Sequence, residues 1–467
     1  MMRTLAALAV ASAVTLAHVV PSRPMEAART SHDATNGAAP PDVAALLAAA
    51  RGAPPVLCAL AAQSLRNSGW GNGWWSAADA PVTPLASALP PRPEGDADDA
   101  NFARLPAAEV ERLLGALAAE DPCVRELSAR LLGQQRDTAA VAAPLVSRLA
   151  AGDASLRTAA AFALGLARPA SAADPLVRAL RDAATGVRAN AAWALGRLEH
   201  GRTLAPLLAL VGDREVVVRE AAVAAVGRFE STGTAGTLAR VLRQDAASSV
   251  RRVAAWALGE LESDESAAAL ATALGRDSDP RVREMAAWAL GQLEGRAGSA
   301  ALAAALRADA SDAVRETAAW ALGEIEDRAA ADALGAAAAG DRSVRVRGTA
   351  AWALGQLDGA VAPAGLLRAL RDESADVRLK AAWSLGQIGD ERAQPAIRDA
   401  LARESDARAR RALVRALLKS GGRSEQSLAQ LLTSGDPQVR EAAVRGLAGR
   451  NAFDPWPWPQ PRPRPFP

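Results

Sequence analysis

Residue types that commonly carry out chemistry are sparse in this sequence. Its three histidines, His18, His32 and His200, lie far apart, and none is followed by the glutamate that a paired His-Glu iron site needs. There is no Cys-x-x-Cys, P-loop or Gly-x-Ser-x-Gly motif, and the carboxylates fall at turn and solvent positions of a repeated pattern. We therefore expect no enzymatic activity, no catalytic or metal-binding residues and no cofactor.

The most regular chemical feature is a column of aromatic residues. Its members are Phe162, Trp193, Trp256, Trp288, Trp320, Trp352 and Trp383, with a gap at Ala224. On a helical wheel this position lies about 160° from the apolar stripe, so we expect the rings to face outward. In the alternative interpretation, each tryptophan only covers the helix of the neighbouring unit.

Polar residues stand four positions before or after these tryptophans. They are Glu284, Gln292, Glu316, Glu324, Gln356 and Gln387. Indole faces hold aliphatic or proline side chains, and amides bond to peptide backbone. Such an arrangement is similar to the way armadillo-type solenoids hold peptides. It predicts a concave, Trp-lined groove for a protein or peptide partner.

The elements that position these residues repeat along the chain. Nine glycines from Gly133 to Gly386 follow one another at steps of 31 or 32 residues, each near the end of an alanine-rich helical segment. A clear copy reads VREMAAWALGQLE at Val282–Glu294, and a second helix precedes each copy. This period predicts an all-α solenoid of about eleven two-helix repeats. The glycine is expected to be a left-handed cap at the helix end.

Aspartate and arginine form two further columns. The arginines that follow the valine are Arg188, Arg219, Arg251, Arg283, Arg315, Arg347, Arg378 and Arg440. Aspartates recur three or five residues before the valine, from Asp121 to Asp436, where we expect them to cap the second helix. Together the columns predict a ladder of charge-assisted hydrogen bonds between adjacent loops.

These motifs resemble the HEAT-like repeats of the phycobilisome-lyase type across most of residues 106–449. That resemblance implies the fold but not the activity, because similar repeats occur in lyases, in deoxyhypusine hydroxylase, in DNA glycosylases and in scaffolds. It leaves two alternatives to a scaffold: a lyase-type enzyme or enzyme subunit acting on a protein-bound cofactor, or an accessory to a membrane sensor peptidase.

The overall charge limits the range of partners. There are 54 basic and 52 acidic residues, a balance that gives no bulk attraction to nucleic acid or to an anionic membrane. We expect no nucleic-acid partner.

Residues 1–20 have the pattern of an export signal. Arg3 precedes an apolar run from Leu5 to Val20, which Pro21 ends. This predicts an exported bacterial protein, periplasmic or extracellular. If the segment is not cleaved, it would act as a membrane anchor, the one membrane contact that the sequence predicts.

The remaining segments divide the chain as follows: residues 21–41 are a linker, 42–104 a helical cap with a Trp/Gly-rich loop and an acidic loop, 105–449 the repeat array, and 450–467 a proline-rich tail. Cys58 in the cap and Cys123 in the first repeat either form a disulfide or are two separate buried thiols. The tail, with Arg462 and Arg464, either occupies the groove, is bound by an external partner, or is solvated.

Overall fold

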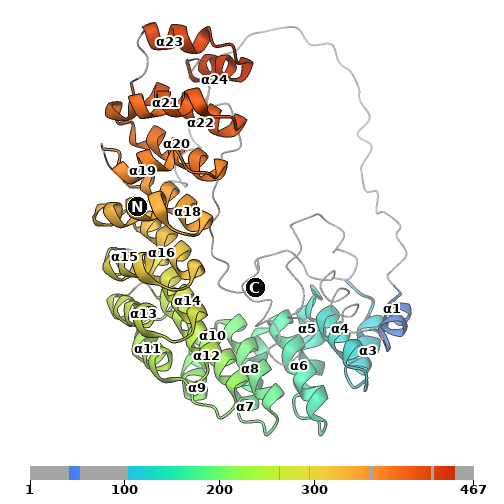
Figure 1. The fold of residues 1–467 in the computed structure, drawn as a ribbon. Helices are drawn as coiled ribbons and strands as arrows, with labels where there is room; N and C mark the ends of the chain where they lie inside the picture. The colour runs from blue at the N-terminus through green and yellow to red at the C-terminus, as the bar shows by residue number, and fades with distance from the viewer. Residues whose placement is uncertain are drawn as a thin grey trace, which may run out of the picture. The chain divides into compact units, whose positions relative to one another are not determined.

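The computed structural model describes residues 42–52 and 104–447, except 262, 294, 358, 360 and 422–424. This part of the chain is helical and contains no β-strand, which confirms the predicted all-α solenoid (Figure 1). The signal, the linker, both loops of the cap and the tail lie outside the described residues, and those predictions stay untested.

Eleven helix pairs follow one another in the described residues. The first helices are α3 (Ala107–Ala116), α5 (Thr138–Arg148), α7 (Ala173–Ala179), α9 (Leu204–Leu210), α11 (Ala235–Gln244), α13 (Asp264–Arg276), α15 (Ser299–Ala308), α17 (Ala331–Gly340), α19 (Ala364–Ala369), α21 (Gln394–Arg403) and α23 (Glu425–Leu432). The second helices are α4 (Pro122–Gly133), α6 (Ala154–Ala167), α8 (Thr185–Leu198), α10 (Val216–Gly227), α12 (Ser248–Gly259), α14 (Pro280–Gln292), α16 (Asp312–Ile325), α18 (Val344–Leu354), α20 (Ala375–Ile388), α22 (Ala407–Lys419) and α24 (Pro437–Leu447). One further helix, α1 (Val43–Ala50), packs against α3 and α4, as a cap would.

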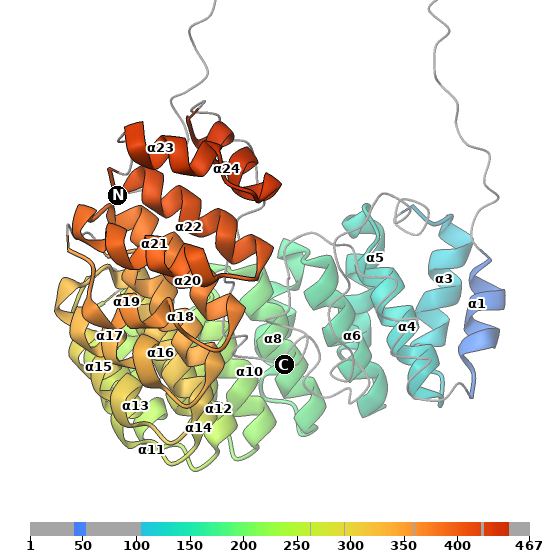
Figure 2. The same ribbon diagram turned by 45° about the horizontal axis from the view of Figure 1, so that its top comes forward.

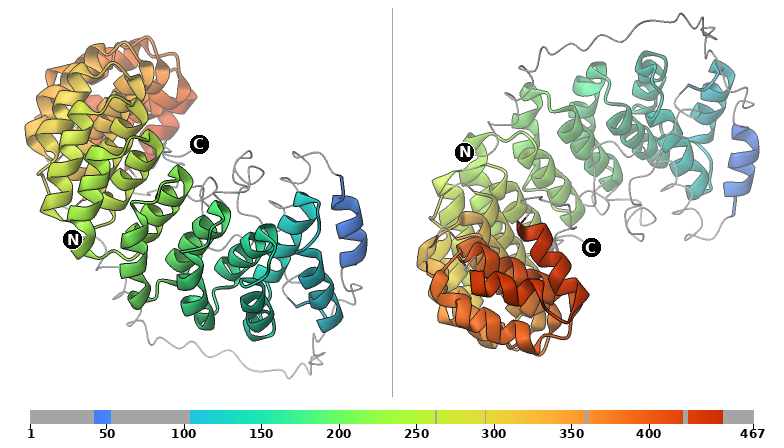
Figure 3. Two further views of the ribbon diagram at one scale, coloured as in Figure 1. Left: turned by 90° about the horizontal axis from the view of Figure 1, so that it is seen from below. Right: turned by 90° about the horizontal axis from the view of Figure 1, so that it is seen from above.

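Each second helix packs against its own first helix and against the second helices of both neighbouring units. Figures 2 and 3 show the same order of pairs from other directions. In Figure 1 the helices α12, α14, α16 and α18 lie on the inner side of the stack, and α11, α13 and α15 on the outer side. We call the side of the second helices that is turned away from the first helices the inner face.

The apolar stripe of the second helix is the core, as its spacing predicts. In α14, Val282, Ala286 and Leu290 recur four residues apart and are buried. Alanine is the commonest residue of the core, so little apolar area is buried per side chain. Close approach between helices must therefore supply much of the packing energy.

The repeated glycine permits this approach, and the predicted left-handed cap is wrong. No glycine of the column has positive φ. In α8 a Cβ added to Gly196 would lie 2.7 Å from the backbone Cα of Ala225 in the next unit. The left-handed residue comes three positions later, at Arg168, Glu199, Glu230, Glu326 and Gly389. The glycine is thus a contact point between helices, and the turn follows it.

The predicted charge ladder is confirmed. Arg283 donates from Nε and Nη2 to the two carboxylate oxygens of Asp309, at 2.7 and 2.9 Å, and from Nη1 to the carbonyl of Asp277 at 2.9 Å. The equivalent pairs are Arg157–Asp182, Arg188–Asp213, Arg219–Asp245, Arg251–Asp277, Arg315–Asp341, Arg347–Asp372, Arg378–Glu404 and Arg410–Asp436. Each arginine therefore joins its own loop to the loop of the unit that follows.

The predicted aspartate caps are confirmed at the start of the array and are wrong from Asp182 to Asp372. Asp121 and Asp153 are N-caps that accept backbone N–H groups of α4 and α6. In α8 the cap residue is instead Ala184, and Asp182 accepts the N–H of that alanine. Here the aspartate stabilises the loop before the helix, because its carboxylate is committed to the arginine of the preceding unit.

Among the described residues, no helix combines the length and the apolar character that crossing a membrane requires.

Candidate protein-binding face

The aromatic column does not face solvent, so the prediction of outward-facing rings is wrong. Trp193, Trp256, Trp288, Trp320 and Trp352 are between 4% and 7% exposed, and Phe162 is buried as well. Trp383 is half-buried and packs against the core. The helical wheel failed here because it treats one helix alone, whereas a neighbouring second helix covers this side.

The glycine column explains how so large a ring is accommodated. An added Cβ on Gly323 would lie 2.9 Å from Cζ3 of Trp352, and one on Gly355 would lie 2.7 Å from Cζ3 of Trp383. The edges of these two indoles therefore lie where the side chain of the preceding unit is missing. The alternative interpretation, in which tryptophans pack between units, fits these contacts.

The polar residues beside the tryptophans are more accessible than the rings. Gln292, Glu324 and Gln387 are exposed, Gln356 is half-buried, and Glu284 and Glu316 are half-buried. Because residues four apart share one side of a helix, they flank the buried rings on α14, α16, α18 and α20. We call Glu284, Gln292, Glu316, Glu324, Gln356 and Gln387 the polar strip.

Two glutamates of the polar strip lie on neighbouring helices and repel each other. Burial raises the pKa of the Glu284 carboxyl, and the like charge of Glu316 on the next helix raises it further. Burial also raises the pKa of Glu316, although Arg345 binds this carboxylate at 3.0 Å. These two helices thus carry partly desolvated negative charge that a cationic group would stabilise.

Two basic side chains that the sequence did not single out lie near these glutamates. Arg345 stands one position before the repeated valine of α18, and Lys380 binds Asp376 at 2.8 Å on α20. Their positions in the repeat could have been read from the sequence, but not their contacts across helices. The polar strip and the side chains beside it therefore carry charge of both signs, which fits a polypeptide better than a nucleic acid.

The sequence matches the HEAT repeats family over residues 142–227, 235–309, 299–376 and 364–418, which together cover more than half of the chain. The chain is a HEAT-repeat protein. The family is the general one, and the phycobilisome-lyase type stays a prediction. No curated protein matches the sequence.

This HEAT-repeat protein is similar in fold to importin-β structures. Yeast importin-β (Kap95p) aligns with a TM-score of 0.53 at 16% identity over 84% of this chain and 60% of that chain. Kap95 in a complex with Nup1 aligns with a TM-score of 0.50 at 14% identity, over 87% and 64%. The chain therefore spans less than two thirds of these relatives, and identities this low show the fold alone.

Human deoxyhypusine hydroxylase also matches, at 27% identity over 54% of this chain and 96% of that chain. Its TM-score of 0.25 is too low to support an argument about activity. In the described part of the HEAT-repeat protein, no group of three or more histidine, cysteine, aspartate or glutamate side chains could hold a metal ion.

The cysteine prediction is tested at one of its two positions. Cys123, at the start of α4, is buried and disulfide-bonded, so it is not a separate thiol. Cys58 is the other cysteine of the HEAT-repeat protein and lies outside the described residues.

Proposed function

We propose that this HEAT-repeat protein is an exported, non-enzymatic scaffold that holds an extended polypeptide along the second helices α14 to α20. One observation carries the proposal: the polar strip repeats accessible amide or carboxylate groups from helix to helix, on either side of rings that are fixed by burial. HEAT-repeat solenoids are commonly protein-interaction scaffolds.

The dimensions of the repeat suit an extended chain. Packed helices lie about 8–10 Å apart, and an extended polypeptide rises about 3.3 Å per residue. One unit therefore corresponds to about three residues of ligand. The amides of Gln292 and Gln356 each offer a donor and an acceptor, as the backbone of such a ligand needs.

The charge of the strip suggests which side chains the ligand carries. Desolvated carboxylates at Glu284 and Glu316 favour lysine or arginine. The basic proline-rich tail of the chain, with Arg462 and Arg464, has this chemistry, as would an external partner. The similar fold of Kap95, which forms a complex with Nup1, supports a protein partner by analogy.

The proposal is tested by selecting ligands from a library of 12-residue peptides displayed on phage, with the full chain as bait. We expect enrichment of basic and proline-containing peptides. The dissociation constant of the best peptide, measured by fluorescence anisotropy, should rise at least about fivefold in the double variant Gln292→Ala, Gln356→Ala, which removes two sets of hydrogen bonds.

The matched control is the double variant Gln244→Ala, Gln430→Ala, which makes the same changes at exposed positions of the first helices α11 and α23. Its affinity should equal that of the wild type. Equal loss in both double variants, or no enriched peptide, would contradict binding at the polar strip. Export is tested separately, by sequencing the N-terminus of protein recovered from the periplasm and the culture medium.

A further inference from the structure

The last helix pair of the array has an arginine without the usual acid. Arg440 of α24 donates from Nη1 to the carbonyl of Ser434 in its own loop, as Arg283 does to Asp277. No described helix pair follows α24, so the contact with an acid of the next unit has no counterpart here. Among the described residues the half-buried Arg440 guanidinium makes no other hydrogen bond or ion pair. It can therefore still bind a carboxylate.

An apolar residue is uncovered on the same helix. Val444 stands one turn after Arg440 and is 55% exposed. The equivalent position of the ten preceding second helices is 0% exposed; it is occupied by Ala129, Ala161, Ala192, Val223, Ala255, Ala287, Ala319, Ala351, Ala382 and Val414. In the same unit, Leu432 of α23 is 39% exposed. The last unit thus exposes apolar surface that is covered in every other unit.

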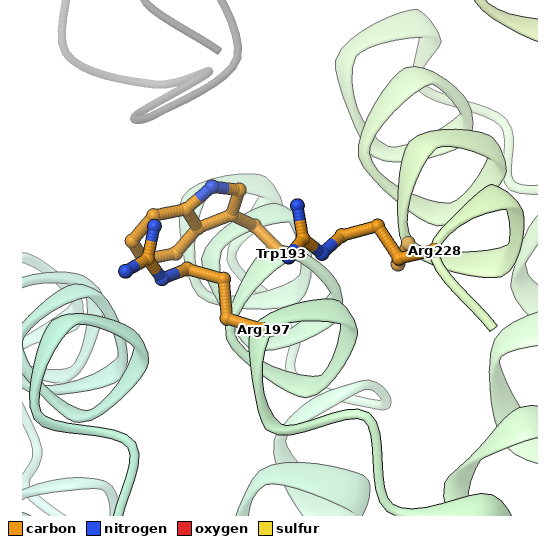
Figure 4. A pocket seen from close by; sticks show the side chains of 4 residues that line it. Trp193, Arg197 and Arg228 are labelled. Carbon is orange, nitrogen blue, oxygen red and sulfur yellow. The ribbon is translucent and has the colours of Figure 1, made fainter. Parts of the chain in front are cut away.

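A junction inside the array shows what a following helix supplies. Arg228 of α10 reaches back to α8, where it lies beside Trp193 and Arg197 (Figure 4). It donates from Nε to the carbonyl of Gly196 at 3.1 Å and from Nη2 to Glu199 at 2.7 Å. A following helix therefore contributes both packing and charge-assisted hydrogen bonds. A segment that covers α24 needs apolar side chains and an acid for Arg440.

The opposite end of the array is already closed by chain outside the repeats. Helix α1 packs against α3 and α4, and the N–H of Gly52 donates to Asp121 at 2.8 Å. A second copy docked head to tail would find this first acid occupied. Two copies docked through their α24 helices would bring Arg440 against Arg440, and the like charges would repel. Both arrangements of copies are therefore disfavoured.

The sequence that follows α24 has the required side chains. Beyond this helix Asp454 is the one acidic residue, and Phe453 and Trp456 stand next to it and two positions after it. Arg440 lies seven residues before Leu447, which is about 10 Å along the helix. The seven residues from Leu447 to Asp454 can span up to about 24 Å when extended. The chain is therefore long enough for Asp454 to return to Arg440.

We propose that residues 448–458 fold back as a cap over the C-terminal end of the array. The Asp454 carboxylate accepts hydrogen bonds from Arg440 and completes the last arginine–acid pair of the ladder. Phe453 and Trp456 cover Val444. The proposal does not rest on the function proposed for α14 to α20, and either can fail without the other.

Hydrogen exchange of the full chain, measured by mass spectrometry, tests the cap. Asp454→Asn should speed exchange in α24 by about tenfold, as expected for the loss of a hydrogen bond between charged groups. Phe453→Ala should speed exchange in α24 as well, whereas α14 should be unaffected by either substitution. Phe466→Ala is the matched control and should change neither helix. Unchanged exchange in Asp454→Asn, or equal effects of the two phenylalanine substitutions, would overturn the cap.

A double-mutant cycle tests the partner of Asp454. Arg440→Gln alone should speed exchange in α24, because it removes the same pair from the other side. Adding Asp454→Asn to Arg440→Gln should then cause no further change. Additive effects of the two substitutions would show that the carboxylate does not act through Arg440, and would overturn the pairing.

Sedimentation velocity separates the cap from a second copy of the chain. We expect the wild type to sediment independently of concentration, since its own residues 448–458 cover Val444. A dimer that forms as the concentration rises, and that Val444→Glu abolishes, would show that another copy covers this end. That result would overturn the assignment to the tail.

Discussion

Each glycine of the column lets the next second helix approach closely, because glycine has no side chain. Within a helix, replacing glycine by alanine normally stabilises the fold by up to about 1 kcal/mol. In this chain the added methyl group would enter space already filled by the next unit. Whether a glycine-to-alanine substitution stabilises or destabilises the fold should therefore depend on this steric contact and not on helix propensity.

We predict that Gly196→Ala lowers the free energy of unfolding by roughly 1–3 kcal/mol, because its Cβ would lie 2.7 Å from the backbone Cα of Ala225, which cannot move independently of its helix. Gly275→Ala in α13 is the matched control, since an added Cβ there meets nothing within 4 Å. Urea denaturation followed by circular dichroism should show opposite shifts for the two variants. A stabilising effect of Gly196→Ala would refute close packing as the reason for this glycine.

The half-buried Glu284 gives a prediction about pH. Its pKa is raised in the folded state by burial and by Glu316, so ionisation destabilises the fold as the pH rises from about 4 through the raised pKa. Glu284→Gln should therefore raise the free energy of unfolding by up to about 1 kcal/mol at pH 7, after allowance for solvent screening.

The advantage of Glu284→Gln should vanish near pH 3, where the glutamate is protonated in both the folded and the unfolded state. Glu111→Gln, at an exposed position of α3, is the control. Denaturation curves at pH 3, 5 and 7 check the trend. A pH-independent difference between wild type and Glu284→Gln would show that charge is not the cause.

At the scale of elements, the sequence predicts the helices, their apolar stripe and the charge ladder, because these depend on spacing within about one unit. The sequence also predicts outward-facing tryptophans and a capping glycine, and both predictions are wrong for the same reason. Both residues take their roles from the neighbouring second helix, and a wheel drawn for one helix contains no neighbour. Gly323 and Trp352 become interpretable only as a pair.

The ladder also shows where repeat length can vary. From Arg188 to Arg378 the arginine stands six residues after the aspartate of its own loop, as Asp309 and Arg315 do. The distance to the acid of the next unit is 25 residues for Arg188 and 26 for Arg219. Units of 31 and 32 residues therefore share one loop geometry, and the extra residue lies between one loop and the next.

At the scale of the molecule, the extensive contacts between helices of the described residues join neighbouring units. In such an array the free energy of unfolding is nearly the sum of contributions from single units and from the interfaces between neighbours. A substitution in one unit should therefore not destabilise distant units. This expectation distinguishes a solenoid from a globular domain with a single core.

Arg315→Lys provides the test. A lysine cannot reproduce the four hydrogen bonds that the Arg315 guanidinium makes to Asp341 and to two carbonyls. Hydrogen exchange measured by mass spectrometry should increase in α16 and α18 and stay unchanged in α6. Arg307→Lys, at an exposed position of α15, should alter neither region. Uniformly faster exchange would indicate that the array unfolds as one unit.

The ladder has a direction, since from α6 to α22 each unit offers its arginine to an acid of the unit that follows. Within this part of the array any unit can therefore follow any other with the ladder intact. In genetic terms, recombination that duplicates or deletes one 32-residue segment, such as residues 282–313, would still bring each arginine beside an acid of the following unit. The number of repeats can thus change by whole units during evolution, while the arginine–acid pairs between units are preserved.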